Sequence, residues 1–530
     1  MPFDIFAAGG TLYRMTTAGV ATALTLPTGV TLSSTRAARM VISGRNIVIT
    51  NGATRSLIVD PEFTVRPLIL RPPSSAPTIA AGAAGGLTGT YRCKYTFIIK
   101  DVNSGALLSE SAFSPISASL TVAAQLIAVT GVQASPDTQT THRRLYRIAT
   151  GGTAYFHWID LDGNTLTEIH SDASDAALAL VAAPTGLGSA PGMAPGTFMT
   201  VIAAWKDRLW GVGNESIDTL VYTNASTSYG WPNSINIPIA GADEFGITGI
   251  MPRRDELGIA KRNVLFKIVT SAGSSFDLIK VKEGKGCWAP ASVVIIDDIA
   301  YFLGEDGVYT WGPGGVQSIS DEKVRGWFAT TTYFNRSEFQ NAVGRYNSTY
   351  HWYELLLAPT GVTARTRWIA YDIKTGKWFG PHLTDDFTPA FASSMVDANS
   401  LSVPILGGTD GFIYYQDSAA TTDDGTLITM SGLSKRHDGN TPDIEKLWLQ
   451  PSLISKIQTA AGAFSITAAV GALNAGVTLT FSPNMTLGRE KFARLDRGRF
   501  VQIGFAGTTS ASQGVEIYGY EVPFHEVGRR

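Results

Sequence analysis

Short segments in which apolar and polar residues alternate, divided by glycine-rich and Asp-Gly turns, follow one another along the chain. Alternation with a period of two predicts β-strands that bury one face. The clearest unit is residues 304–328. In it an Asp-Gly turn leads into the aromatic strand 308–311, and the glycines of 312–315 reverse the chain into a returning strand at 316–319. This pattern predicts a β-hairpin.

A short helix is expected directly after this hairpin. Ser320 precedes two acidic residues, and this order is typical of a helix N-terminus, where a hydroxyl caps the first turn and carboxylates suit the helix dipole. Val324, Trp327 and Phe328 follow at i, i+3 and i+4 and form one apolar stripe. The helix is therefore expected to close an apolar core.

The first half of this unit recurs. Residues 407–415 repeat the order of glycine, turn, Asp-Gly and aromatic strand, residues 9–14 give a weaker copy, and residues 371–379 form a comparable hairpin. Repeated turn-then-aromatic-strand units are typical of β-propeller blades. Sheet units are expected near 198–230, 247–288, 291–320, 341–381 and 391–416, and residues 1–70 add a further blade. The sequence thus predicts an all-β fold with a propeller of about six blades, built from 1–70 and 197–420.

An insertion at 72–183 is expected to interrupt the propeller. A Pro/Ser-rich linker at 71–77 and a low-complexity Ala/Gly segment at 80–89 precede it, and residues 82–89 are interpreted as a flexible hinge. Strands are predicted at 90–100, near 116–121 and 126–131, and at 143–147 and 154–159. Strands at this spacing predict a small sandwich, whose order resembles a fibronectin type III module, and a Gly/Pro-rich linker at 184–196 closes it.

The last part of the chain, 425–530, is predicted to be a C-terminal β-sandwich. Alternating strands are expected at 446–450, 463–470, 476–481 and 499–505, and 515–522 is interpreted as the last strand. The tail from His525 to Arg530 is too polar for a core.

Composition limits the function classes. Charged residues make up 16% of the chain, against about 25% in typical soluble domains, which fits a surface largely covered by partners. A net charge of −2 gives no basic balance for tight nucleic-acid binding. No apolar run is long enough for a membrane span, and the acidic N-terminus does not resemble a signal peptide, so we expect synthesis in a cytoplasm. Cys93 and Cys287 are expected to be free thiols.

The chain offers little catalytic chemistry. No histidine pairs with another histidine or a cysteine at zinc spacing. Three Asp-Asp pairs, at 297–298, 385–386 and 423–424, sit where turns are expected, and neighbouring strand residues face opposite sides. No nucleophile elbow or phosphate loop is present, and residues 101–105 predict a hairpin loop rather than a calcium site. We therefore expect no enzyme, no catalytic or metal-binding residues and no cofactor. The seven histidines are His142, His157, His170, His351, His382, His437 and His525.

Two groups of residues could mark a binding surface instead. Basic residues gather between 253 and 285, and either a solvated blade edge or a contact with phosphate or an acidic partner would explain them. Tryptophans at blade spacing could line a sugar-binding mouth, although aromatic rungs between sheets are the simpler interpretation. These tryptophans are Trp205, Trp210, Trp231, Trp288, Trp311, Trp352 and Trp378.

The order of residues 304–324 resembles a recurrent motif of phage tail proteins, in which an Asp-Gly turn, an aromatic strand, a glycine turn and a Ser-Ile-Ser-x-Glu-Lys-Val segment lie within a propeller. Residues 498–503 and 516–521 resemble the closing strands of the same proteins. The family is the tail nozzle, or tail tubular protein B-like, group of short-tailed bacteriophages. The resemblance covers roughly 200–530 and is weaker over 1–70, and none of its motifs is catalytic.

This resemblance implies a structural virion protein of the phage tail, made in the bacterial host cytoplasm. It implies a homohexameric ring that forms a DNA conduit below the head-to-tail adaptor protein and supports DNA ejection. The partners would be other copies of the chain, the adaptor, tail fibres or spikes, and double-stranded DNA passing without sequence-specific binding. We expect the channel face not to be net basic, because phosphate contacts would hold DNA back. The alternative is a carbohydrate- or receptor-binding propeller of a tail fibre or spike apparatus.

Overall fold

The structure is a computed structural model in which the chain divides into two compact units, residues 1–416 and 417–530. Most of the chain is described. The residues outside the description are 1–2, 17–18, 34–35, 165–168, 172–173, 179–181, 184–198, 214–215, 224–235, 240–244, 272–274, 330–331, 384–386, 397–398, 400, 417–421, 424–425, 428, 435, 456–463, 473–474, 482–488, 496, 509–516 and 529–530.

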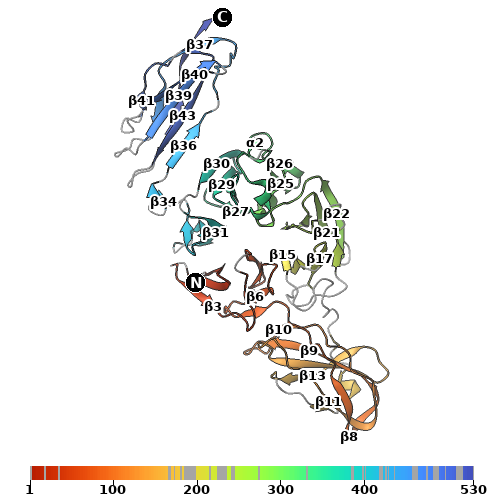
Figure 1. The fold of residues 1–530 in the computed structure, drawn as a ribbon. Coiled ribbons are helices and arrows are strands. Elements are labelled where there is room, and N and C mark those ends of the chain that lie inside the picture. The colour runs from red at the N-terminus through yellow and green to blue at the C-terminus, as the bar shows by residue number, and fades with distance from the viewer. Residues whose placement is uncertain are drawn as a thin grey trace. The chain divides into compact units, whose positions relative to one another are not determined.

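The larger unit contains a β-propeller (Figure 1). Its described part has seven antiparallel sheets, which we number as blades 1 to 7. Blades 1 and 7 have three strands and blades 2 to 6 have four. The strands are β1 (Phe3–Ala8), β2 (Thr11–Thr16) and β3 (Ala21–Leu24) in blade 1; β4 (Arg39–Ser43), β5 (Asn46–Thr50), β6 (Leu57–Val59) and β7 (Val65–Pro67) in blade 2; β15 (Met199–Trp205), β16 (Arg208–Gly213), β17 (Thr219–Tyr222) and β18 (Asn236–Pro238) in blade 3; β19 (Gly249–Pro252), β20 (Glu256–Ala260), β21 (Val264–Thr270) and β22 (Phe276–Glu283) in blade 4. The remaining strands are β23 (Val294–Ile296), β24 (Ile299–Leu303), β25 (Val308–Gly312) and β26 (Gly315–Ser318) in blade 5; β27 (Val343–Asn347), β28 (Trp352–Leu357), β29 (Arg367–Asp372) and β30 (Lys377–Leu383) in blade 6; and β31 (Pro389–Val396), β32 (Ser402–Gly408) and β33 (Ile413–Tyr415) in blade 7.

A separate apolar core lies between each pair of neighbouring blades, and these cores close the ring. The closing core packs Met15 and Phe6 of blade 1 against Met395, Ile405 and Phe391 of blade 7. The predicted fold class is confirmed: the chain is all-β, with a propeller, an inserted sandwich and a C-terminal sandwich. The propeller has one blade more than the predicted six, because residues 3–67 form two sheets instead of one.

The hairpin predicted within residues 304–328 forms β25 and β26 of blade 5. The role expected for Ser320 is wrong. Its hydroxyl accepts a hydrogen bond of 3.0 Å from the backbone N–H of Val308, and the helix α2 begins only at Arg325 (α2, Arg325–Ala329). Ser320 is buried, so its hydroxyl satisfies a strand instead of a helix end. The apolar stripe is confirmed, because Val324 and Phe328 are buried in the core between blades 5 and 6, with Trp327 packed against it.

The recurring turn places the same chemistry in two blades. In blade 5, the carboxylate of Asp306 accepts a hydrogen bond from the hydroxyl of Tyr309. In blade 7, Asp410 accepts one from Tyr414 at 2.5 Å. Both turns join the second and third strands of their blades, so the repeat in the sequence marks equivalent positions in the propeller.

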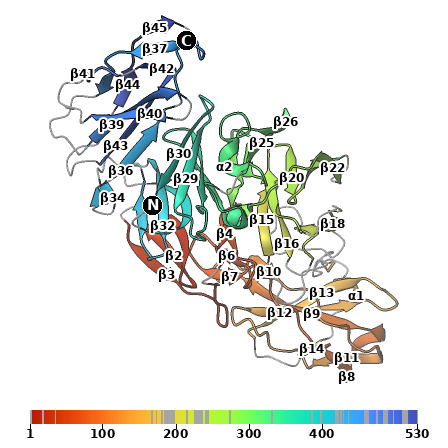
Figure 2. The same ribbon diagram turned by 45° about the horizontal axis from the view of Figure 1, so that its top comes forward.

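The insertion between blades 2 and 3 is a sandwich of a four-stranded and a three-stranded sheet (Figure 2). Its core lies between them and includes Tyr95, Phe97, Ile127 and Leu145. The four-stranded sheet has the order β10-β9-β12-β13 and the other has the order β14-β11-β8. The elements are β8 (Thr78–Tyr91), β9 (Cys93–Lys100), β10 (Leu107–Glu110), β11 (Leu120–Thr130), β12 (His142–Ile148), β13 (Tyr155–Asp162), β14 (Ile169–Ser171) and the short helix α1 (Asp175–Leu178).

The interpretation of residues 82–89 as a flexible hinge is wrong. They lie within β8, which pairs with β11 along most of its length. Small residues are needed there because a Cβ on Gly85 would lie 2.6 Å from a side-chain carbon of Leu126, and one on Gly89 would lie 2.3 Å from Thr150. The two strands predicted near 116–121 and 126–131 are the single strand β11. The predicted linker at 184–196 lies outside the described residues.

A buried ion pair fixes the sandwich to blade 2. The guanidinium of Arg55 lies 2.5 Å from the carboxylate of Asp137, and both side chains are buried. Arg55 also donates to the carbonyl of Ile69 at 2.6 Å, and Asp137 accepts from the backbone N–H of Arg71 at 3.0 Å. Blade 2, the segment 69–71 that leads into the insertion and Asp137 of the sandwich therefore meet at one ion pair.

The smaller unit, residues 417–530, packs its strands around a core that includes Trp448, Ile466, Val470 and Val501. The prediction that 515–522 is the last strand is wrong: β45 follows it and pairs with β37, because an exposed edge strand tolerates a polar sequence. The strands are β34 (Thr422–Asp423), β35 (Thr426–Leu427), β36 (Thr429–Leu433), β37 (Glu445–Trp448), β38 (Ser452–Ser455), β39 (Phe464–Ala472), β40 (Ala475–Phe481), β41 (Arg489–Lys491), β42 (Arg497–Gly498), β43 (Phe500–Thr508), β44 (Ile517–Glu521) and β45 (Phe524–Gly528). The predicted domain limits at 1–70, 72–183, 197–420 and 425–530 stay predictions.

Two further elements are short 3-10 helices, η2 (Pro290–Ser292) and η3 (Arg336–Asn341). In the described part of the chain, no helix has both the length and the apolar character needed to cross a membrane. The described residues also contain no group of three or more His, Cys, Asp or Glu side chains that could hold a metal ion.

Candidate interaction surface

Most of the tryptophans singled out from the sequence pack between neighbouring sheets. Trp205, Trp210 and Trp311 are buried. The indole N–H of Trp205 donates to the carbonyl of Arg253 at 2.6 Å, and that of Trp378 donates to the carbonyl of Ile319 at 2.9 Å. Both bonds join different blades, so these side chains stabilise the propeller. Trp288 and Trp378 are partly buried in the same way, and Trp231 lies outside the described residues.

The basic residues between 253 and 285 do not form one binding patch. Arg253 is buried against Trp311 and pairs with Glu256 at 2.8 Å. Lys261 is buried and pairs with Asp218 at 2.8 Å, and Lys285 pairs with Asp306 at the same distance. These cations hold blades together, which supports the structural interpretation over contact with phosphate.

The histidines and acidic pairs are dispersed. His142 and His157 lie in the sandwich near Asp162 and Asp160, and His351 contacts Tyr346 at 2.8 Å in a turn. His437 contacts Tyr520, and Asp297 and Asp298 form the turn between β23 and β24 with positive φ angles. The side chains of His170 and Asp423, and residues 385, 386 and 424, lie outside the described part.

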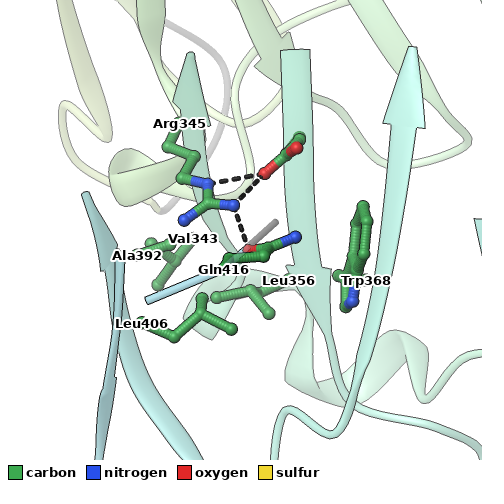
Figure 3. Close-up of a pocket in the computed structure, with 8 residues that line it drawn as sticks. Val343, Arg345, Leu356, Trp368, Ala392, Leu406 and Gln416 are labelled. Atoms are coloured by element: carbon green, nitrogen blue, oxygen red, sulfur yellow. Dashed lines mark hydrogen bonds and ion pairs between the residues drawn. The ribbon is translucent and has the colours of Figure 1, made fainter. Parts of the chain in front are cut away.

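A small depression between blades 6 and 7 is filled by a polar network (Figure 3). The guanidinium of Arg345 donates to Glu354 at 2.5 Å and to the carbonyl of Ile405 at 2.8 Å, and it also donates to the side-chain oxygen of Gln416. Asn347 donates to the other oxygen of Glu354 at 2.9 Å. Because the cation and the carboxylate satisfy each other, this network joins two blades and is not a ligand site.

An exposed stack of three aromatic rings lies on the side of blade 6 that faces blade 7. The rings of Tyr350 and Trp352 are 4.7 Å apart and those of Trp352 and Phe379 are 5.0 Å apart, each pair nearly parallel. The strand register places Glu354, Ala370 and Phe379 on one face, and Trp352 shares it. Tyr350 is 45% exposed and Phe379 is 37% exposed. We call Tyr350, Trp352 and Phe379 the aromatic stack.

Large apolar side chains are also exposed on blade 7 itself. Phe412, in the turn before β33, is 68% exposed, and Tyr415, at the end of β33, is 51% exposed. β33 is the outermost described strand of a three-stranded sheet. Blades 6 and 7 thus each carry exposed aromatic residues, and these are the candidate interaction surfaces. The alternation of apolar and polar residues predicts the strands. It does not predict a stack whose rings come from different strands, because their contact depends on the register of the sheet.

Comparisons with known proteins identify no family. No family model matches the chain, and no curated protein matches it in sequence. A solved structure of PorZ, an essential bacterial surface component of the type-IX secretion system of Porphyromonas gingivalis, aligns at 10% identity over 99% of this chain and 80% of that chain, with a TM-score of 0.26. An exo-beta-1,3-galactanase from Phanerochaete chrysosporium aligns at 11% identity over 90% of this chain and 100% of that chain, with a TM-score of 0.17. At these TM-scores neither alignment carries an inference about this chain.

Proposed function

We propose that the chain is the structural subunit of a phage tail nozzle, a homohexameric ring around the DNA exit channel below the head-to-tail adaptor. The observation that carries this proposal is the position of the motif on which the resemblance rests. Residues 304–324 span the turn, the hairpin β25–β26 and the approach to α2 within one blade of a propeller. The same turn recurs at the equivalent position of blade 7.

The composition of the surface supports the proposal that the chain is the subunit of an assembly. A ring with heterologous contacts needs two different adhesive surfaces on each copy. The exposed aromatic residues of blades 6 and 7 provide one, and aromatic side chains are enriched where protein interfaces bind most tightly. The charged fraction of only 16% agrees with a chain whose surface is extensively covered.

Single-particle electron microscopy of the native particle tests this function. We expect a sixfold ring on the particle axis beneath the head, with each subunit fitting the propeller and its inserted sandwich. A peripheral position, or no position in the particle, would reject the nozzle.

A carbohydrate-binding propeller is the second candidate, and the aromatic stack is the observation that favours it, because sugars bind against exposed aromatic rings. A glycan array with the full chain separates the two candidates. Specific binding that is lost in Trp352→Ala would favour the receptor-binding function, and no binding would favour the nozzle.

A further inference from the structure

We infer that blade 7 is completed by a second copy of this chain, whose strand β8 adds to the open edge of β33. This inference rests on the proposed ring and assigns one of its contacts. Blades 2 to 6 each contain a fourth, outermost strand, whereas the described parts of blades 1 and 7 end at the third strands β3 and β33. Addition of a strand to an exposed sheet edge is a common mode of protein recognition.

The hydrogen-bond pattern of β33 shows which groups face the open edge. The backbone N–H of Gln416 donates to Pro404, and that of Gly408 donates to Phe412, so alternate residues of this segment bond to β32. Ile413 and Tyr415 lie between these positions and pair with Gly407 and Ile405 without such bonds. Their N–H and C=O groups therefore point away from β32, toward the place of a fourth strand.

Phe379, one ring of the aromatic stack, lies on the outer strand of blade 6, on the face against which a fourth strand of blade 7 would pack. In the other blades, outer strands are covered by the neighbouring sheet, as Phe276 and Leu278 of β22 are packed in the core between blades 3 and 4. On the side of blade 6 that faces blade 7, Phe379 of the outer strand β30 stays 37% exposed instead, with the ring of Trp352 stacked on it. A strand with small side chains would fit beside these large rings, because large and small residues interdigitate in packed layers.

β8 has the composition of such a strand. Its 14 residues, Thr78–Tyr91, contain no charged residue and no proline, and Ala80, Ala83 and Ala84 are exposed. It is the edge strand of its sheet and lies at the margin of the sandwich in Figures 1 and 2. Natural proteins usually protect long edges with lysine, proline or cover. The unprotected part of β8 is thus suited to pair with another chain.

Two other outer segments of the same chain are protected in ways that β8 is not. The N-terminal half of β9 is covered by residues 111–117, in which Ser111, Ser114 and Ser117 each donate a backbone hydrogen bond to β9 and accept one at the hydroxyl. The outer strand β22 carries the charged residues Lys280, Lys282 and Glu283. The register of β8 with β11 shifts between residues 81 and 84 and again between 84 and 89, but β8 carries no charged residue.

The two edges are also suitably placed for a closed ring. Between blade 7 and the insertion point after blade 2 lie two and a half blade spacings, or about 130° around a seven-bladed ring, and the two neighbours of a subunit in a hexamer lie about 120° apart. One edge accepts a strand and the other donates one, so the contact is heterologous and can repeat around the ring.

Disulfide trapping between copies tests the contact. Full-length chains with Ala80→Cys, Ala83→Cys or Ala84→Cys are mixed with differently tagged chains that carry Phe412→Cys or Tyr415→Cys, and oxidised both as purified protein at high concentration and in assembled particles. Cross-strand neighbours lie within disulfide range, so at least one pair should give about ten-fold more mixed dimer than a Val362→Cys control, which is exposed elsewhere. Native Cys93 and Cys287 do not interfere, because both are buried and burial raises the pKa of each thiol to about 12.

A backbone test follows from the same geometry. Tyr415→Pro removes an N–H that points outward, leaves the bonds to β32 intact and changes a side chain that is 51% exposed, so the variant should keep the wild-type melting temperature but lose ring assembly. A sixfold axial ring with no preferred trapping of β8 to β33 overturns this inference and leaves the nozzle standing. Preferred trapping without an axial ring would support the contact and reject the nozzle.

Discussion

Arg345 pairs with Glu354 within blade 6 and joins blade 6 to blade 7 by donating a hydrogen bond of 2.8 Å to the carbonyl of Ile405. Both side chains are 4% exposed. Arg345→Met keeps the volume but leaves a buried carboxylate unpaired, which should lower the free energy of unfolding by about 3–5 kcal/mol. Chemical denaturation of the full chain, followed by tryptophan fluorescence, measures this loss. Lys280→Met, which removes a cation from the exposed pair with Glu283, is the matched control and should change nothing measurable.

His382 makes the stability of blade 6 depend on pH. Its ring stacks on Trp368 at 4.0 Å, and burial lowers its pKa from 6.5 to about 4. Between these values the unfolded chain binds a proton that the folded chain does not. The free energy of unfolding therefore falls as the pH falls from 6.5 to 4, and His382 contributes no pH dependence above 6.5. His382→Phe should flatten this part of the profile of unfolding midpoint against pH. An unchanged difference between pH 7 and pH 4.5 would contradict the assignment.

At the scale of elements, the segment 111–117 that covers β9 should stabilise the sandwich as a paired strand would. The hydroxyl of Ser114 accepts the N–H of Tyr95 at 3.0 Å, and both residues are buried. Ser114→Ala leaves that N–H without its acceptor and should cost about 1–3 kcal/mol. Faster hydrogen exchange at the amide of Tyr95 should accompany the loss. Ser119→Ala, at an exposed position that accepts from Arg92, should leave both quantities unchanged.

The sequence predicted elements well where side chains alternate and poorly where backbone geometry decides. The aromatic strands of blades 5 and 7 and the helix stripe at Val324 and Phe328 follow from periodicity. β8 was misinterpreted because Ala and Gly carry no period, and its strand state depends on the close approach of Leu126 and Thr150. Ser320 was misassigned because its partner, Val308, lies twelve residues away across a hairpin. The aromatic stack could not be predicted, since Trp352 and Phe379 meet only through the register of β28, β29 and β30.

At the scale of the larger unit, the insertion is useful to an assembly only if it is held at a fixed angle to the propeller. The ion pair of Arg55 and Asp137 provides this constraint, together with a hydrogen bond of 2.6 Å from Gln139 to the carbonyl of Val65. The pair is buried where blade 2 meets the sandwich, and each domain has its own apolar core. Loss of the pair should therefore free the angle between two domains that both stay folded.

Arg55→Met tests this constraint. The variant should keep its strand content by circular dichroism, because neither core loses a contact, while small-angle X-ray scattering should show a larger radius of gyration and a broader distance distribution. Protease cleavage within residues 71–77 should become faster for the same reason. Lys285→Met removes a more exposed pair, with Asp306, inside the propeller and should leave the scattering curve unchanged. A scattering curve identical to the wild type for Arg55→Met would mean that the remaining contacts alone fix the insertion. The ring contact through β8 would then not depend on this charge pair.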